Sequence, residues 1–152
     1  MLPPPSITRA VRALAVCSLV ALVAGIPAQA SGPRLTPAAY RAKATAICNA
    51  LNTFTPPASG TFAQKFTVLV GEAISARKEL GNLRPPTSLA LLHAKVIALE
   101  ARDIDFFRSL LNQLRAGKIG TAQLIASFAQ APSGTDEDRI WKQLGVPACV
   151  EG

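Results

Sequence analysis

The chain has 152 residues, 49% of them hydrophobic and 16% charged, and its 16 Lys and Arg against nine Asp and Glu give a formal net charge of +7. This composition excludes an intrinsically disordered protein, which would be less apolar and more highly charged. It also excludes a membrane protein with several spans, because such a protein needs several long uncharged segments. The length is typical of a single domain.

Residues 1–30 have the pattern of a secretory signal peptide. A basic start is followed by an apolar run, a helix-breaking Ile-Pro pair and two small residues at the positions that a signal peptidase reads. The apolar run is shorter than the ~20 residues that cross a bilayer as a helix. We therefore expect cleavage between Ala30 and Ser31, and a mature protein that is soluble, secreted, periplasmic or associated with the cell envelope, and not membrane-spanning. In this pattern the basic start is Arg9 and Arg12, the apolar run is residues 13–25, and the small residues are the two alanines of Ala28-Gln29-Ala30.

Cleavage would leave two of the three cysteines, Cys48 and Cys149, in a single domain over residues 31–152. Cys17 would be removed with the signal peptide. An even number of cysteines in an exported chain favours a disulfide over free thiols. Their wide spacing does not fit a CxxC redox or zinc motif. A bridge that closes a loop of ~100 residues can stabilise a fold by ~4–5 kcal/mol.

The first part of the mature chain predicts two amphipathic helices. Thr36 is a favourable N-cap, and Pro37 suits the first helical position. Residues 55–60 contain two prolines and a glycine, which cannot continue a helix. Thr61 and Gln64 then form the pattern of a capping box at the start of the next helix. Apolar residues recur at three- and four-residue spacing, which predicts that the two helices cover residues 37–54 and 61–80.

The second part predicts one long helix and one broken helix. The long helix covers residues 88–116 and ends at Gly117, which tolerates a positive φ. The last helix is interrupted at Pro132-Ser133-Gly134, and we expect Thr135 to restart it with Asp138 as its capping partner. Short loops between amphipathic helices predict an all-α fold: an antiparallel up-down four-helix bundle, broken in its fourth helix and preceded by the signal peptide. The two parts of that helix are expected over residues 121–131 and 135–144.

Three short motifs stand out: Ala44-Thr45-Ala46-Ile47-Cys48, Leu80-Gly81-Asn82-Leu83-Arg84-Pro85-Pro86 and Leu144-Gly145-Val146-Pro147-Ala148-Cys149. In these motifs the chain resembles a group of small exported helical-bundle proteins that are common in actinobacteria. The resemblance covers nearly all of residues 37–149 and implies a helical fold and export. It implies no functional residue, because the group has no established activity. The break in the last helix departs from the group, in which that helix is usually continuous.

The sequence lacks the usual motifs of catalysis and of cofactor or metal binding. It has no Gly-x-Ser-x-Gly, CxxCH or Glu-x-x-His motif and no glycine-rich phosphate loop. The single histidine, His93, lies two turns from any carboxylate of its own helix, and we predict a partly exposed surface residue. We therefore predict no enzyme activity, no cofactor and no catalytic or metal-binding residue. A small hydrolase that uses Asp103 or His93 is an alternative.

Asp103 interrupts the apolar stripe of the long helix. If the loops are treated as hairpin ends, Asp103 shares one layer with Thr67, Cys48 and the break at residues 132–134. Its carboxylate could then cap free N–H groups where the last helix restarts, or a tilt of the helix could expose it. Alternatively, Asp103 and Thr67 could line a small polar pocket.

The same register sets a condition for the disulfide. A straight continuation of the last helix would leave Cys149 ~22 Å from the layer of Cys48. A disulfide needs Cα atoms ~4.4–6.8 Å apart. The bridge therefore requires the chain to turn back along the first helix at residues 145–147.

The positive charge is spread over both ends of the predicted bundle. Without aromatic interleaving or a recognition motif, nucleic acid is not an expected partner. Weak, salt-dependent attraction to anionic envelope components is more plausible. We expect a non-enzymatic binding or structural module of the cell envelope or extracellular space, with a cationic protein of the membrane surface or an envelope polymer as the alternative. The cations are Arg77, Lys78 and Arg84 at one end and Arg108, Arg115 and Lys118 at the other.

Overall fold

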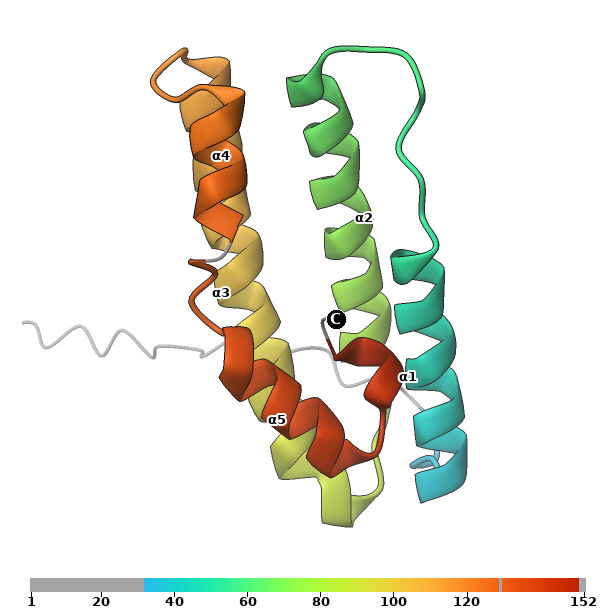
Figure 1. Cartoon of the computed structure of the whole chain (residues 1–152). Coiled ribbons are helices and arrows are strands. Elements are labelled where there is room, and N and C mark those ends of the chain that lie inside the picture. Colours follow the sequence, from blue (N-terminus) through green and yellow to red (C-terminus); the bar gives the residue numbers. More distant parts are fainter. Residues whose placement is uncertain (1–31, 129, 151–152) are drawn as a thin grey trace, which may run out of the picture.

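The computed structural model describes residues 32–128 and 130–150, which form helices and no strands (Figure 1). The predicted signal peptide and its cleavage site lie outside the described residues. The predicted all-α fold is confirmed. The elements are α1 (Pro37–Asn52), α2 (Phe62–Gly81), the 3₁₀ turn η1 (Thr87–Leu89), α3 (Ala90–Arg115), α4 (Thr121–Phe128), α5 (Gly134–Leu144) and the 3₁₀ turn η2 (Pro147–Cys149).

The first two helices begin as their sequences predict. Thr36 Oγ1 accepts a hydrogen bond from the backbone N–H of Ala39 at the start of α1, and Pro37 occupies the first turn. At the start of α2, Thr61 N–H donates to Gln64 Oε1 over 2.7 Å, and Gln64 N–H donates to Thr61 Oγ1 over 3.2 Å. These reciprocal bonds satisfy two backbone donors that the helix itself leaves unpaired.

Three long helices run antiparallel, and two short helices share the fourth position (Figure 1). α2 packs between α1 and α3, whereas α4 returns along one end of α3. α5 then crosses the other end of α3 at an angle, and η2 lies against α1. The structure therefore differs from a regular four-helix bundle, because the break changes the direction of the fourth helix.

The restart of the last helix differs from its predicted form. α5 begins at Gly134 with Ser133 as its N-cap residue, so Thr135 lies inside the helix and does not cap it. The carbonyl of Ser133 accepts the first bonds of the helix, from the N–H groups of Asp136 and Glu137. Ser133 Oγ makes no capping bond because it donates to the carbonyl of Leu99 in α3.

The chain turns back after α5 as the disulfide requires. Gly145 ends α5 with a φ of +74°, and a Cβ atom there would lie 2.7 Å from Arg41 Nε. Arg41 Nε donates a hydrogen bond to the carbonyl of Leu144 over 2.9 Å, which ties the turn to α1. The predicted disulfide between Cys48 and Cys149 is present, with 5.1 Å between the Cα atoms.

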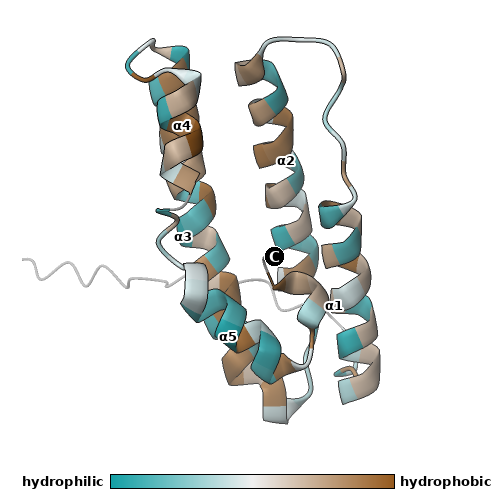
Figure 2. Ribbon diagram, in the orientation of Figure 1, coloured by the Kyte–Doolittle hydropathy of each residue, from teal (hydrophilic) through white to brown (hydrophobic). Residues whose placement is uncertain are grey.

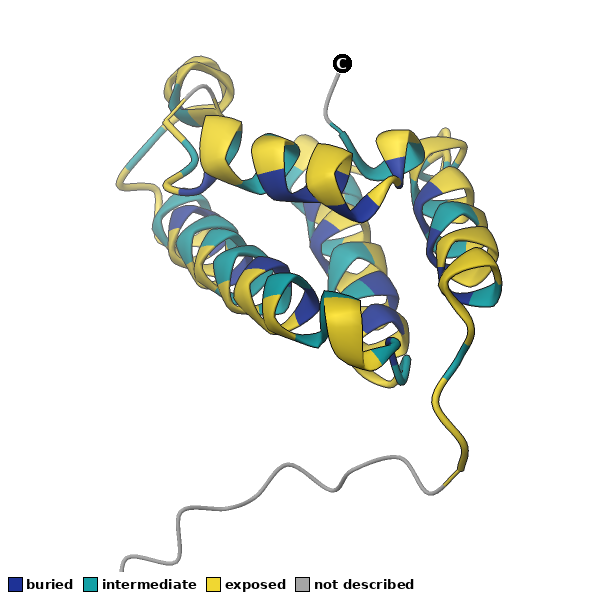
Figure 3. Ribbon diagram, turned by 90° about the horizontal axis from the view of Figure 1, so that it is seen from below, coloured by how far each residue is buried: buried dark blue, intermediate teal, exposed yellow. Residues whose placement is uncertain are grey.

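Two hydrophobic cores fill the two ends of the molecule. We call them the disulfide core and the phenylalanine core. Figure 2 shows hydrophobic residues concentrated along α4, and Figure 3 shows buried residues on the inner sides of the helices. The buried members of the disulfide core are Tyr40, Ala44, Cys48, Leu80, Val96, Ile140, Trp141, Leu144 and Val146. Those of the phenylalanine core are Phe66, Val70, Leu110, Leu111 and Leu124, with Phe106 and Phe107 packed against them.

Candidate functional site

A cavity of about 160 Å³ lies between the two cores. Its walls come from α1, α2, α3 and α5 and from the segment that carries the disulfide. The lining mixes apolar side chains with charged ones, so the cavity offers both kinds of contact to a small molecule. The lining residues are Cys48, Leu51, Asn52, Ala73, Ala76, Arg77, Leu80, Glu100, Asp103, Ile104, Phe107, Glu137, Trp141, Cys149 and Val150.

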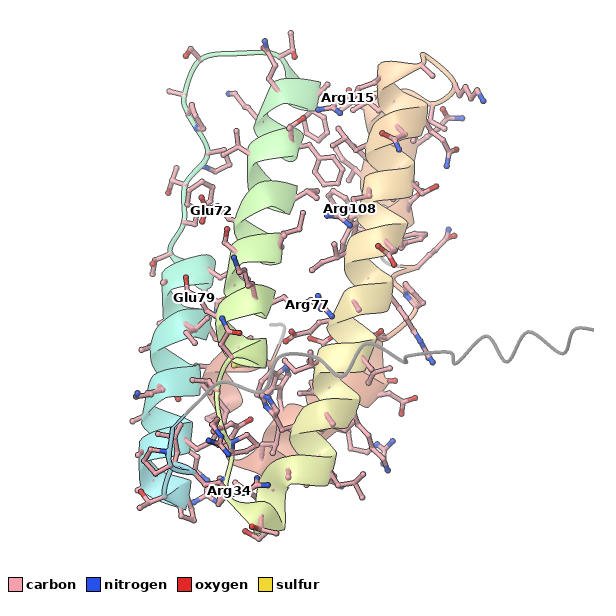
Figure 4. All side chains as sticks on the ribbon, turned by 180° about the vertical axis from the view of Figure 1, so that it is seen from behind. Arg34, Glu72, Arg77, Glu79, Arg108 and Arg115 are labelled. Carbon is pink, nitrogen blue, oxygen red and sulfur yellow. A yellow bond between two sulfur atoms is a disulfide. The ribbon has the colours of Figure 1, made fainter. Side chains whose placement is uncertain are left out.

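Four charged side chains meet at the cavity. Arg77 extends from α2 toward α3, where its Nε donates to the carbonyl of Ile97 over 3.3 Å (Figure 4). Glu100 and Asp103 come from α3, where residues three apart lie on the same face. Glu137 comes from the first turns of α5. Three carboxyl groups therefore share the lining with one guanidinium group.

Trp141 and Glu100 carry buried polar atoms that make no hydrogen bond of ordinary geometry. The Trp141 side chain is completely buried, at 0% exposure, and its Nε1 has no hydrogen-bond partner of ordinary geometry. Glu100 Oε2 is also buried without a partner. Both residues line the cavity. A buried donor or acceptor left unpaired costs about 1–3 kcal/mol, so this pair favours a bound group that would satisfy it.

The environment of Glu100 raises the pKa of its carboxyl to about 7. Burial is the main cause, because it disfavours the charged form, and the nearby charge of Asp103 adds to it. The positive charge of Arg77 and the nearby indole N–H of Trp141 lower the pKa, but by less. The indole therefore lies close to the carboxyl, although the two groups do not form a hydrogen bond of ordinary geometry.

Asp103 holds the break between α4 and α5. Its Oδ1 accepts a hydrogen bond from the backbone N–H of Ser133 over 3.1 Å. This is the contact with the broken backbone that the capping interpretation predicts. Asp103 also lines the cavity, so the same carboxylate supports the fold and contributes charge to the site.

Thr67 does not join Asp103. Its hydroxyl donates to the carbonyl of Ala63 over 2.6 Å and accepts a hydrogen bond from Arg115 over 2.9 Å. On α2, the residues that share the cavity with Asp103 are Ala73, Ala76, Arg77 and Leu80, which begin roughly two turns further along the helix. The hairpin estimate of the register therefore does not hold between α2 and α3.

His93 is buried, at 7% exposure, so the expectation of a partly exposed surface residue is wrong. Its Nδ1 lies 2.9 Å from the hydroxyl oxygen of Tyr40 in a buried hydrogen bond. Burial lowers the pKa of His93 and raises the pKa of Tyr40. The spacing contains a signal for this burial, because His93 lies four residues after Leu89 and three before Val96, on the apolar stripe.

An apolar groove of about 350 Å³ adjoins the cavity. The two spaces share Leu51, Ala73, Ile104 and Phe107 as lining residues. The groove continues toward the phenylalanine core, and partly exposed apolar side chains such as Leu69 and Phe128 line it there. The cavity, which carries the charged side chains, and the apolar groove thus form adjacent parts of one site between α2 and α3. The remaining groove residues are Phe66, Val70 and Ala131.

The described residues contain no group of three or more His, Cys, Asp or Glu side chains arranged to hold a metal ion. Within the same part of the chain, no helix has the length and apolar character needed to cross a membrane. Comparison with known proteins identifies no relative: no family model, curated protein or solved structure is significantly similar to this chain.

Proposed function

We propose that this chain is an exported, non-enzymatic binding protein that holds a small molecule in the cavity between α2, α3 and α5. The observation that carries the proposal is the pair of buried atoms Trp141 Nε1 and Glu100 Oε2 beside that cavity, neither of which makes a hydrogen bond of ordinary geometry. A ligand that bonds to both atoms would remove the cost of leaving them unpaired. The adjoining groove brings the total volume into the range of small-molecule sites, about 300–1,000 Å³.

The alternative of a small hydrolase has less support, since its two candidate residues are separated and engaged. Asp103 is bonded to Ser133 at the cavity, whereas His93 is bonded to Tyr40 and does not line the cavity. A triad mechanism needs a nucleophile, a base and an orienting group within hydrogen-bond reach of one another. Asp103 and His93 therefore do not form such an arrangement with each other.

Export is supported by two independent features. Residues 1–30 have the signal-peptide pattern, with cleavage expected between Ala30 and Ser31. The Cys48–Cys149 disulfide is a bond that persists mainly in oxidising, extracytoplasmic compartments. Together they support a protein of the cell envelope or the extracellular space.

The alternative of a cationic surface-binding protein has less support from the arrangement of the charges. Arg108 pairs with Asp105, and Arg139 pairs with Asp136, all of them exposed. Arg115 is engaged with Thr67. Exposed pairs of this kind contribute little energy, and they divide the positive charge instead of forming one patch.

Native mass spectrometry tests the proposal on the protein recovered from its own host without reductant. We expect a chain that begins at Ser31, is two hydrogens lighter than the reduced chain and carries an additional small molecule. The variant Glu100→Gln should lose that molecule, whereas Glu79→Gln, at an exposed site outside the cavity, should retain it. A bare protein would contradict the binding function, and retained residues 1–30 would contradict signal cleavage.

A further inference from the structure

We infer that the ligand is an uncharged amphipathic alcohol, with its hydroxyl group between Trp141 and Glu100 and its apolar tail in the adjoining groove. The inference rests on the proposed function and adds the chemical class of the ligand. Three observations support it: the other charged groups of the cavity are engaged within the protein, one hydrogen-bond donor and one acceptor remain, and the groove beside them is apolar.

The charged side chains of the cavity do not require a charged ligand. Arg77 donates from its Nε to a backbone carbonyl of α3 and interacts with the carboxyl of Glu100. The carboxylate of Asp103 accepts the hydrogen bond from Ser133 N–H. Glu137 also has an interaction within the protein. An ionic head would therefore lose its hydration in the cavity without an unengaged counter-charge to replace it.

The two atoms that remain define the head of the ligand. Trp141 Nε1 is a donor and Glu100 Oε2 is an acceptor, both are buried, and neither makes a hydrogen bond of ordinary geometry. The indole lies close to the carboxyl, so one group between them has to accept from the first and donate to the second. A hydroxyl oxygen does both at a single atom. A quaternary ammonium accepts no hydrogen bond, and a carboxylate is repelled by the ionised form of Glu100.

The groove determines the other part of the ligand and distinguishes an alcohol from water. A water molecule offers the same donor and acceptor as a hydroxyl group, but it gains nothing from apolar walls. The groove begins at side chains that it shares with the cavity, including Ala73 and Ile104, and continues past Phe107 to Leu69 and Phe128. A polar tail would lose its hydration there without gaining hydrogen bonds, whereas an alkyl or aromatic tail would bury apolar surface.

Trp141 makes this site directly observable. It is the single tryptophan of the chain, and it lines the cavity while completely buried. A hydroxyl group that bonds to its N–H changes the polarity around the indole. The fluorescence of the protein therefore reports on the cavity without a label.

The test titrates the oxidised protein, freed of bound small molecules, with 1-octanol, octanoate and heptyl methyl ether at pH 8 and follows Trp141 fluorescence and binding heat. The ether is an isomer of 1-octanol that accepts a hydrogen bond but cannot donate one. We expect 1-octanol to bind at least about tenfold more tightly than either compound, because only its head satisfies both buried atoms. Equal or tighter binding of the ether or of octanoate would overturn the inference but leave the binding function in place.

Two variants separate the head from the tail. At pH 8, Glu100→Gln replaces a charged acceptor with a neutral one, so it should weaken 1-octanol about tenfold. The same change removes a like charge and should tighten octanoate. Leu69→Ser, in the groove, should weaken both compounds, and the exposed control Glu79→Gln should change neither. If Glu100→Gln shifts 1-octanol and octanoate in the same direction, the assigned head site is wrong.

A third variant tests the donor. Trp141→Phe keeps an aromatic ring in the core but removes the indole N–H, and its binding is followed by heat. It should weaken 1-octanol and heptyl methyl ether by the same factor, because both accept from the indole. Unchanged binding of both would show that Trp141 does not contact the head.

Absence of binding by all three compounds would overturn the inference and leave water as the group that bridges the two buried atoms. The proposed function would still be decided by the molecule that accompanies the native protein.

A pH series provides a check that needs no variant. The other titratable or charged groups around Glu100 and its cavity are Tyr40 on α1, Arg77 on α2, Asp103 on α3 and Glu137 on α5. Because the pKa of Glu100 is raised to about 7, its carboxyl becomes ionised as the pH rises from 5.5 to 8, whereas octanoate is ionised throughout. The ionised carboxyl repels octanoate and strengthens the bond from a hydroxyl group. The preference for 1-octanol over octanoate should therefore increase about tenfold over that range, and a constant or falling preference would contradict the assigned head site.

Discussion

The disulfide core and the phenylalanine core are both apolar, but they are closed to different degrees. Five of the large side chains in the disulfide core (Tyr40, Val96, Trp141, Leu144 and Val146) are completely buried, and the disulfide joins its first and last segments. Around the phenylalanine core, Ile125 is 53% exposed and Phe62, Leu69 and Phe128 are each between 37% and 38% exposed. The first region therefore has the characteristics of a stable scaffold, and the second those of a partly open, accessible surface.

The comparison explains the location of the proposed site. The cavity lies at the junction of the two cores, where α5 leaves α3 and the groove begins. Its polar end belongs to elements that the disulfide and Trp141 hold in place. Its apolar end opens toward α4, which is the shortest α-helix of the described chain at eight residues.

Loss of the disulfide should have the largest effect on stability. The double variant Cys48→Ala, Cys149→Ala removes a bridge between residues 101 positions apart, and the chain-entropy model predicts a loss of about 4–5 kcal/mol. Chemical denaturation of oxidised, reduced and variant protein measures it. Reduction and the double variant should agree, and a loss below about 1 kcal/mol would show that the disulfide core does not depend on its bridge.

Truncation of one apolar side chain in each region compares the two directly. Leu144→Ala, in the disulfide core, should cost about 2–5 kcal/mol, because it removes a fully buried side chain and leaves a cavity. Ile125→Ala, on the exposed side of α4, should change the free energy of unfolding by about 0.5 kcal/mol or less. Equal losses would contradict the difference that we describe between the two regions.

The buried carboxyl of Glu100 should make stability depend on pH. Its pKa is about 7 in the folded protein and 4.5 without the environment of the fold, so the folded state keeps a proton that the unfolded chain releases. Stability therefore falls as the pH rises between these values.

Glu100→Gln removes this dependence. Relative to the parent protein, the variant should gain up to about 3 kcal/mol between pH 4.5 and pH 8, with most of the gain below pH 7. Comparing the two proteins at each pH cancels the contribution of His93, whose lowered pKa has the opposite effect below about pH 6.5. A constant difference between variant and parent would mean that Glu100 is not buried as described.

Removal of the hydrogen bond between Asp103 and Ser133 at the helix break should lower the free energy of unfolding by a small but measurable amount. Asp103→Ala leaves the N–H of Ser133 without its acceptor, and losses of this kind cost about 0.5–2 kcal/mol. Asp103→Asn retains an acceptor oxygen and should cost less. If both variants unfold at the same denaturant concentration as the parent, the contact does not hold the break.

Local sequence signals predicted the parts of the structure that local chemistry determines. The capping pair Thr61 and Gln64 defines the start of α2, and Pro132 and Gly134 interrupt the last helix. The pairing of Cys48 with Cys149 also followed, because only two cysteines remain after residue 30. In each case a few neighbouring residues, or a simple count, contain the information.

The candidate site depended on tertiary geometry that these signals do not contain. Trp141 and Glu100 meet only because α5 crosses α3 at an angle, whereas the regular bundle expected from the loops would align them differently. The same assumption misplaced Thr67. His93 was misassigned because its polarity was given more weight than its position on the apolar stripe.

Hydrogen exchange resolved by residue, on the native protein with and without the small molecule that it carries, tests most directly the claim that a stable core and an accessible one meet at a binding site. We predict that amides of α1 and α5 exchange only through global unfolding, and that α4 exchanges through local opening at a lower free energy. The ligand should slow exchange in α4 and in the facing segments of α2 and α3. Equal protection of α4 and α5, unchanged by the ligand, would contradict the account.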